Sequence, residues 1–190
     1  MMEVYIVFTD TKTSWAKLIK SYTRYPFSHV SLSFSKDLSQ MYSFSFGRKQ
    51  AGEPFSGFVK EDVRDNLFQQ ADCAVYTWEL SEESYGKVLQ YVKKMEQDQD
   101  LFKYNFRGLL AVVLNYHSKR IDAYFCSQFV AEALAAGNVR VADKPAALVT
   151  PRDLIASGST MIHNGYVQDY PFLGRASGCV ETDLVLEGME

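Results

Sequence analysis

The sequence predicts a single domain that contains both β-strands and α-helices. Runs of β-branched and aromatic residues are interspersed with segments of helical spacing. The length of 190 residues suits one domain with a sizeable core. Because no internal repeat, low-complexity tract or linker divides the chain, the predicted domain covers residues 1–190.

Four segments rich in β-branched and aromatic residues are predicted to be strands. They are residues 4–8, the segment starting at His29, residues 41–46 and residues 73–80. A loop at residues 35–39 should join the second and third strands into a hairpin, which residues 47–49 close. Residues 50–66 contain glycine and proline and are expected to be irregular, and residues 180–186 are predicted to form a last strand.

Three segments have the features of amphipathic or buried helices. Residues 13–22 start with hydroxyl side chains that can cap a helix. Residues 81–97 begin with a sequence similar to a capping box. Residues 126–137 form an apolar, alanine-rich stretch that ends at a glycine. The apolar residues near 104–114 are expected to begin a further buried helix.

Composition and charge exclude several classes of protein. The net charge of -3 gives no reason to expect a nucleic-acid partner. The longest apolar run, residues 108–114, is too short to span a bilayer, and no signal peptide is recognised. Three cysteines without paired spacing indicate neither a disulfide framework nor a metal site. A reduced, cytoplasmic setting without a cofactor is therefore expected.

Cys126 is the strongest candidate for a nucleophile, because it is expected at or just before the first turn of a helix. The unpaired N–H groups there stabilise a thiolate and can hold an oxyanion. A thiol nucleophile needs a base, and His29 on a predicted strand is the candidate. The alternative is a buried cysteine that packs as a small hydrophobe and a histidine whose nitrogens are satisfied by backbone.

Four parts of the chain, taken in order, resemble the circularly permuted branch of the papain-like, NlpC-type amidase superfamily. They are residues 18–32 with Ser28-His29-Val30, residues 41–44, residues 104–108, and residues 124–130 followed by 149–154. The resemblance covers most of residues 4–155. In this branch the histidine strand precedes the cysteine helix, an order that the lecithin:retinol acyltransferase group shares.

The resemblance implies an α+β, permuted papain-like fold. An antiparallel sheet, curled toward a barrel and packed against helices, would carry His29, and a helix N-terminus would carry Cys126. Family members place a His, Asn, Gln or Glu on the strand after the histidine strand. Here Ser43 falls nearest to that place, and Ser45 shares its face. This departure leaves open a slow enzyme, a different substrate class or a degenerate site, and both serines can also be ordinary strand residues.

Two further residues are given supporting roles. The resemblance implies that Tyr104 lies beside the cysteine, where its hydroxyl can touch the thiolate or the tetrahedral intermediate; the alternative is a core aromatic. Ser127 can cap the helix, while the Cys126 N–H is the better oxyanion donor. His117 and His163 are expected at the surface, the latter because Asn164-Gly165 is a turn signal.

The combined expectation is a cysteine hydrolase that cleaves an amide, either a peptide or an isopeptide bond, through a cysteinyl acyl-enzyme. Its partner would be a small peptide, amide or acyl-lipid substrate, and no metal is required. Two alternatives remain open. One is a lipid or thioester acyltransferase or esterase on the same fold. The other is a non-catalytic binding module that has lost the complete triad.

Overall fold

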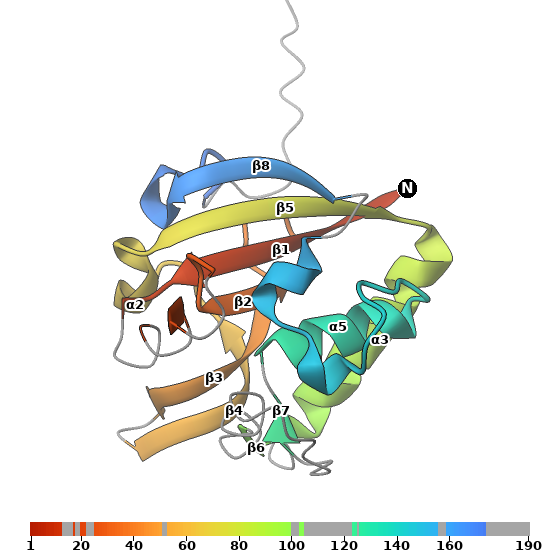
Figure 1. Ribbon diagram of the computed structural model, residues 1–190, viewed down its shortest axis with the longest axis horizontal. Helices are drawn as coiled ribbons and strands as arrows, with labels where there is room; N and C mark the ends of the chain where they lie inside the picture. Colours follow the sequence, from red (N-terminus) through yellow and green to blue (C-terminus); the bar gives the residue numbers. More distant parts are fainter. Residues whose placement is uncertain are drawn as a thin grey trace, which may run out of the picture.

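The protein is described by a computed structural model. The described residues are 1–12, 17, 20–21, 25–50, 53–99, 103–104, 123–124, 126–155 and 159–173. Within these ranges the chain forms an α+β fold, in which one sheet packs against two main helices (Figure 1). The coarse class that the sequence predicts is therefore confirmed.

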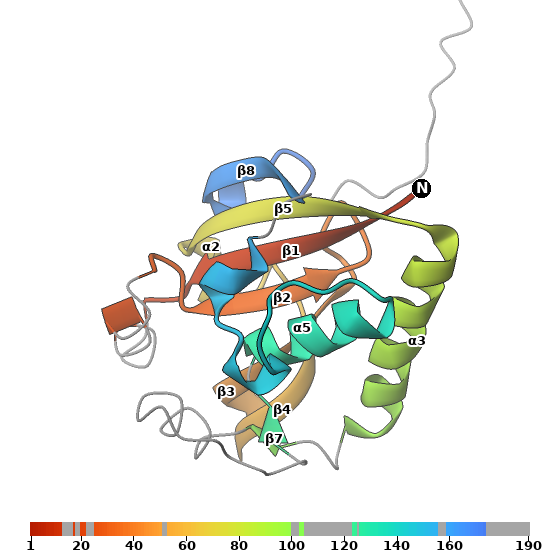
Figure 2. The ribbon, with the colours of Figure 1, turned by 45° about the vertical axis from the view of Figure 1, so that its right-hand side comes forward.

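The described residues form one eight-stranded sheet with the order β7-β6-β4-β3-β2-β1-β5-β8. Its six longer strands are antiparallel to their neighbours and are listed here in chain order: β1 (Met2–Asp10), β2 (His29–Ser33), β3 (Met41–Gln50), β4 (Glu53–Glu61), β5 (Asp72–Leu80) and β8 (Ser159–Tyr166). The short strands β6 (Lys103–Tyr104) and β7 (Ala123–Tyr124) extend one edge and run parallel to each other. Figures 1 and 2 show a strongly twisted sheet, as the handedness of strands requires.

Helices α3 (Glu82–Gln97) and α5 (Cys126–Ala136) lie side by side on one side of this sheet (Figures 1 and 2). The short helix α2 (Asn66–Gln69) lies between β4 and β5 in the chain. Three short 3₁₀ turns follow α5, at Ala146–Leu148, Pro151–Leu154 and Val167–Asp169. None of the described helices is long and apolar enough to cross a membrane.

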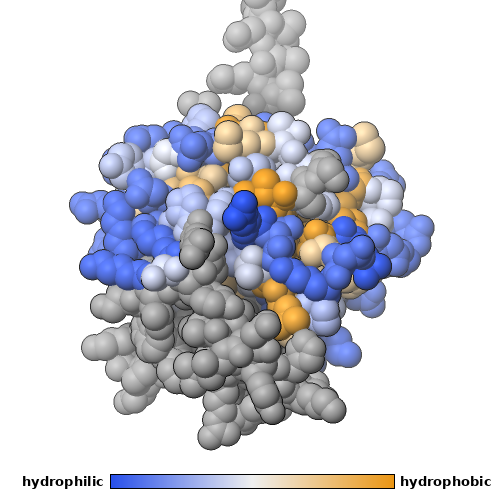
Figure 3. All heavy atoms as spheres, in the orientation of Figure 1, coloured by the Kyte–Doolittle hydropathy of each residue, from blue (hydrophilic) through white to orange (hydrophobic). Residues whose placement is uncertain are grey.

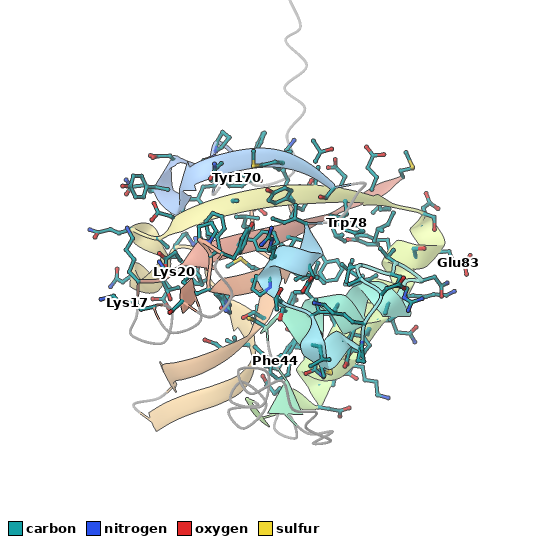
Figure 4. The ribbon with its side chains drawn as sticks, viewed as in Figure 1. Lys17, Lys20, Phe44, Trp78, Glu83 and Tyr170 are labelled. Carbon is teal, nitrogen blue, oxygen red and sulfur yellow. The ribbon has the colours of Figure 1, made fainter. Side chains whose placement is uncertain are left out.

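Alternating side chains of the central strands build two hydrophobic cores. On β1, Ile6 and Phe8 belong to the core shared with the helices, while Tyr5 and Val7 belong to the core on the other face. Tyr170 closes the second core and lies near β8 in Figure 4. The face drawn in Figure 3 is largely hydrophilic, with smaller apolar groups between the charged side chains. Both faces of the sheet are thus anchored by buried apolar residues.

Helix α5 is held in place at both of its ends. Near its start, the fully buried Phe129 ring lies 5.7 Å from the Phe44 ring of β3 and 5.5 Å from the Phe58 ring of β4. Phe44 is labelled in Figure 4. Just past its end, a Cβ on Gly137 would come within 2.6 Å of Val88 Cγ2 on α3. Only glycine lets the two helices approach this closely. These contacts fix where the first residue of α5 lies relative to the sheet.

Most of the elements predicted from sequence are confirmed. Strands occur at all four predicted places, and helices occupy residues 82–97 and 126–136. Ser81 caps α3 by accepting a hydrogen bond from the Ser84 N–H, as its sequence predicts. The predicted strand at 180–186, the apolar segment after 104 and most of residues 13–22 lie outside the described residues.

Two predictions about the region after residue 46 are wrong. Residues 47–49 do not close the hairpin, because β3 continues to Gln50 past an irregularity between Phe46 and Arg48. Residues 50–66 are not irregular, because they contain β4. The glycine and proline of this stretch are compatible with a strand here, since, among the described residues, the outer side of β4 pairs with β6 only at Gly57.

Replacement of Phe129 by alanine should lower the free energy of unfolding by about 3–5 kcal/mol, because it opens a cavity where α5 meets β3 and β4. Urea titration followed by circular dichroism measures this change. The matched control is Met161→Ala, since the Met161 side chain is 52% exposed and should change stability by less than about 0.5 kcal/mol. Equal effects of the two variants would contradict the packing described here.

Candidate active site

Cys126 is the first residue of α5 and follows the short strand β7. It is a free thiol and only 6% exposed. The N–H groups in the first turn of a helix have no partner within that helix and carry partial positive charge. The structure therefore places the sulfur where a thiolate or an oxyanion is favoured, in the position that the sequence predicts.

The Ser127 hydroxyl, which the sequence suggests as a helix cap, forms a bond to a more distant part of the chain. Its buried hydroxyl donates a hydrogen bond to the backbone oxygen of Val149. This bond ties the start of α5 to the segment that leads into the turn at Pro151–Leu154, which Thr150 and Asp153 cap reciprocally. With its proton engaged in this way, the Ser127 hydroxyl anchors the helix start to the segment around Val149.

His29 is the first residue of β2 and is 15% exposed at its side chain. Its backbone is fixed by β1, where Thr9 pairs with His29 and the Thr9 oxygen accepts from the Ser28 N–H. The Cys126 side chain lies close enough to the ring to help raise the pKa of His29. Two residues that are 97 positions apart in the chain thus meet in space, and the strand and the helix start each hold one of them.

Glu61 is the partner of His29 that sequence reasoning missed. Its Oε1 lies 3.1 Å from His29 Nε2, and its side chain is 1% exposed. Glu61 is the last residue of β4, and β3 lies between β4 and β2, so the carboxylate reaches across one strand to the ring. The second oxygen, Oε2, accepts a hydrogen bond of 2.5 Å from Ser31 Oγ. An imidazole between a thiol and a carboxylate is the arrangement of a catalytic triad.

Ser43 and Ser45, the predicted third residue and its neighbour, do not contact His29 through any hydrogen bond recorded for the described residues. The Ser43 hydroxyl is fully buried, and no described group lies in hydrogen-bonding geometry with it. It nevertheless lies close enough to Glu61 to help lower the pKa of that carboxyl group. The expectation of a serine as the group that orients the imidazole is therefore corrected to a glutamate.

Burial and charge act in opposite directions on this pair. Burial alone lowers the pKa of His29, but the Glu61 charge and the hydrogen bonds to Cys126 and Glu61 raise it from 6.5 to about 10. Burial raises the pKa of Glu61, yet the His29 charge, the hydrogen bonds of His29 and Ser31 and the nearby Ser43 hydroxyl hold it below its ordinary value of 4.5. At neutral pH the site therefore contains an imidazolium and a carboxylate.

The other candidate residues lie elsewhere or outside the described part. Tyr104 pairs through its backbone with Tyr124, two residues before Cys126, which brings β6 to the start of α5; its side chain lies outside the described residues. His117 also lies outside them. His163 is half-buried within β8 and contacts the Tyr166 oxygen at 3.0 Å, so the turn predicted at the residues that follow it is wrong.

Cys73 is chemically unlike Cys126. It lies on β5 in the second core, and burial together with nearby acidic groups raises its pKa to about 12. Such a thiol stays protonated and inert at neutral pH. Among the described residues, no group of three or more His, Cys, Asp or Glu side chains is arranged to hold a metal ion. The chemistry of the described site thus depends on the thiol, the imidazole and the carboxylate.

Comparisons with known proteins identify a fold and no family. No protein-family model matches the chain, and no curated protein matches it. Among solved structures, one described as the crystal structure of metalloprotein yiiX from Escherichia coli O157:H7, DUF1105, is similar. The likeness has a TM-score of 0.56 and 17% sequence identity, and covers 87% of this chain and 98% of that chain. At this identity the likeness concerns the arrangement of the backbone alone.

The pH dependence of stability should reveal the buried pair. Because folding raises the pKa of His29 from 6.5 to about 10, its protonation stabilises the fold fully below pH 6.5, and this contribution is lost as the pH rises to about 10. The slope should approach about 1.4 kcal/mol per pH unit in that range. Urea titrations of the wild type and Glu61→Gln across this range measure it. A stability difference between the two proteins that stays constant with pH would contradict the buried ion pair.

Proposed function

We propose that the protein is a cysteine hydrolase that cleaves an amide bond through a cysteinyl acyl-enzyme, on a circularly permuted papain-like fold. The observation that carries the proposal is the His29 ring, whose Nε2 lies 3.1 Å from Glu61 Oε1 and whose pKa the nearby Cys126 side chain helps to raise. The order of the elements supports the permuted arrangement, since the histidine strand β2 precedes the cysteine helix α5. The substrate would be a peptide, an isopeptide or another small amide.

The resting site favours a thiolate beside an imidazolium. Nε2 of His29 is engaged with Glu61, which leaves Nδ1 as the nitrogen for the thiol. The raised pKa of His29 means that its ring already carries the proton at neutral pH. Together with the helix start, this positive charge stabilises the sulfur as an anion. In this proposal His29 acts first as an acid, because its ring already carries a proton when the substrate is attacked.

The reaction follows from these protonation states. The Cys126 sulfur attacks the carbonyl carbon, and the Cys126 N–H at the start of α5 stabilises the oxyanion. The imidazolium of His29 gives its proton to the leaving nitrogen as the C–N bond breaks and the thioester forms. Neutral His29 next removes a proton from water, whose oxygen attacks the thioester and releases the acid. The sulfur leaves as a thiolate, and Glu61 stays ionised throughout.

Glu61 also bears on the choice between an enzyme and a binding module. A site lacking a third polar group was the reason to consider a degenerate module, and Glu61 supplies that group. A carboxylate stabilises an imidazolium, whereas a serine hydroxyl only orients the ring. We include a reduced, cytoplasmic setting in the proposal, because Cys73 and Cys126 are both free thiols.

The reactivity of Cys126 tests the proposal without knowledge of the substrate. In the wild type, iodoacetamide should alkylate Cys126 well below pH 8.5, the usual pKa of a free thiol being about 8.5. His29→Ala should move the reaction toward that ordinary range. Mass spectrometry of the Cys126 peptide separates it from Cys73 and Cys179. Alkylation of Cys126 only above about pH 8.5, unchanged in His29→Ala, would favour the binding module over the enzyme.

Turnover should depend more strongly on Cys126 than on Glu61. Cys126→Ala should abolish hydrolysis, and Glu61→Gln should lower kcat by about 100-fold or more, because the imidazolium loses its counter-charge. Hydrolysis of a panel of peptide, isopeptide and thioester compounds measures both effects. Met161→Ala is the control and should keep full activity, since its side chain is exposed. Faster turnover with an added amine or alcohol than with water alone would instead support an acyltransferase.

A further inference from the structure

Ser31 lies beside both members of the buried ion pair. It follows His29 by two residues on β2, so their side chains leave the same face of the strand. Its side chain is fully buried. Its Oγ donates to Glu61 Oε2 at 2.5 Å and lies 3.3 Å from His29 Nε2. One hydroxyl thus touches the carboxylate and the ring at once.

The bond to Oε2 matters because a carboxylate has two oxygens and only one of them faces the ring. Oε1 of Glu61 is occupied by His29. The Ser31 hydroxyl donates to Oε2 and so compensates this buried oxygen for lost contact with water. The Glu61 side chain also crosses the full width of β3, and a long chain of this kind has several rotamers. A donor on β2 selects the rotamer that keeps Oε1 on the ring.

We propose that Ser31 is a positioning residue, whose hydroxyl locks the Glu61 carboxylate against Nε2 of His29 and thereby directs Nδ1 at Cys126. That this positioning serves catalysis rests on the proposed function. That Ser31 holds the carboxylate rests on its contacts with Glu61 and His29. Ser31 does not touch the substrate in this account. It acts through Glu61, and Glu61 acts through His29.

Several charged groups surround Glu61, and the test has to separate their effect on its pKa from the effect of the Ser31 hydrogen bond. From within the site, the titratable groups that face it are His29 on β2 and Cys126 on α5. A cavity of about 400 Å³ at Glu61 is lined by the charged and polar residues Asp37, Ser39, Lys60, Asp62 and Arg64, and by the apolar Val63. The exposed Arg64 pairs with Asp62 at 3.0 Å. A change at Ser31 alters none of these charges, so its effect on Glu61 is attributable to the lost hydrogen bond.

Ser33 provides a matched control on the same strand and the same face. It is fully buried like Ser31, but its hydroxyl donates to the Ser35 backbone oxygen at 2.9 Å. The same hydroxyl accepts from the Ser35 N–H at 3.2 Å, so Ser33→Ala removes two hydrogen bonds to backbone without touching Glu61. Ser31→Thr keeps the hydroxyl in a residue that suits a strand. These variants separate a loss of stability from a loss of positioning.

The experiment measures the titration of the Glu61 carboxyl carbon by ¹³C NMR in the full chain. Ser31→Ala should raise the pKa of Glu61 by about one unit, a tenfold change in its proton affinity, because a charge-assisted hydrogen bond is lost. Ser33→Ala and Ser31→Thr should titrate like the wild type. Ser31→Cys, a weaker donor of similar shape, replaces Ser31→Ala if the alanine variant does not fold. Equal midpoints in the Ser31→Ala and Ser33→Ala proteins would overturn the proposal.

A second readout separates this inference from the proposed function. At about pH 5, alkylation of Cys126 by iodoacetamide should fall about tenfold in Ser31→Ala and stay unchanged in Ser33→Ala. If Cys126 is activated by His29 but Ser31→Ala behaves as Ser33→Ala does, the positioning role fails and the hydrolase stands. If Cys126 is inert in the wild type, the hydrolase fails, and the Glu61 titration still decides whether Ser31 holds the carboxylate.

Discussion

The buried contact between His29 and Glu61 is the interaction on which the candidate site depends. Charges removed from water are stable only when they are paired and hydrogen-bonded. Here the carboxylate is 1% exposed and has His29 on one oxygen and Ser31 on the other. The ring in turn is paired with the carboxylate, and the Cys126 thiol helps to raise its pKa. Each group therefore influences the charge state of the next, and removing any one takes away a contact that stabilises a buried charge.

The fold imposes this contact through three strands and one helix. The register that places Met41 of β3 opposite both Ser33 of β2 and Glu61 of β4 keeps the carboxylate on the same face as the start of β2. A slip of one residue would turn the Glu61 side chain to the other face. Helix α5 completes the site, because Phe129 seats it on β3 and β4. The aromatic core is thus also what holds the sulfur against the imidazole.

The sequence predicts the two residues whose local signals are strong. Cys126 precedes an alanine-rich helix, and His29 opens an apolar strand, so each position follows from its neighbours. Glu61 has no such signal, since its role depends on pairing across β3 and its strand contains a proline and a glycine. Ser127 also shows the limit of local reasoning, because the acceptor of its hydroxyl, Val149, lies 22 residues away. Contacts between distant strands and loops are set by register and packing, which one sequence does not display.

The protonation state of the His29 ring tests the central claim most directly. Nitrogen-15 NMR of the histidine side chains at about pH 8 distinguishes an imidazolium from a neutral ring in the wild-type protein. With the pKa of His29 raised to about 10, the ring should carry protons on both nitrogens at that pH, and in Glu61→Gln it should be largely neutral. A neutral His29 ring at that pH in the wild type, with the same spectrum in Glu61→Gln, would contradict the account.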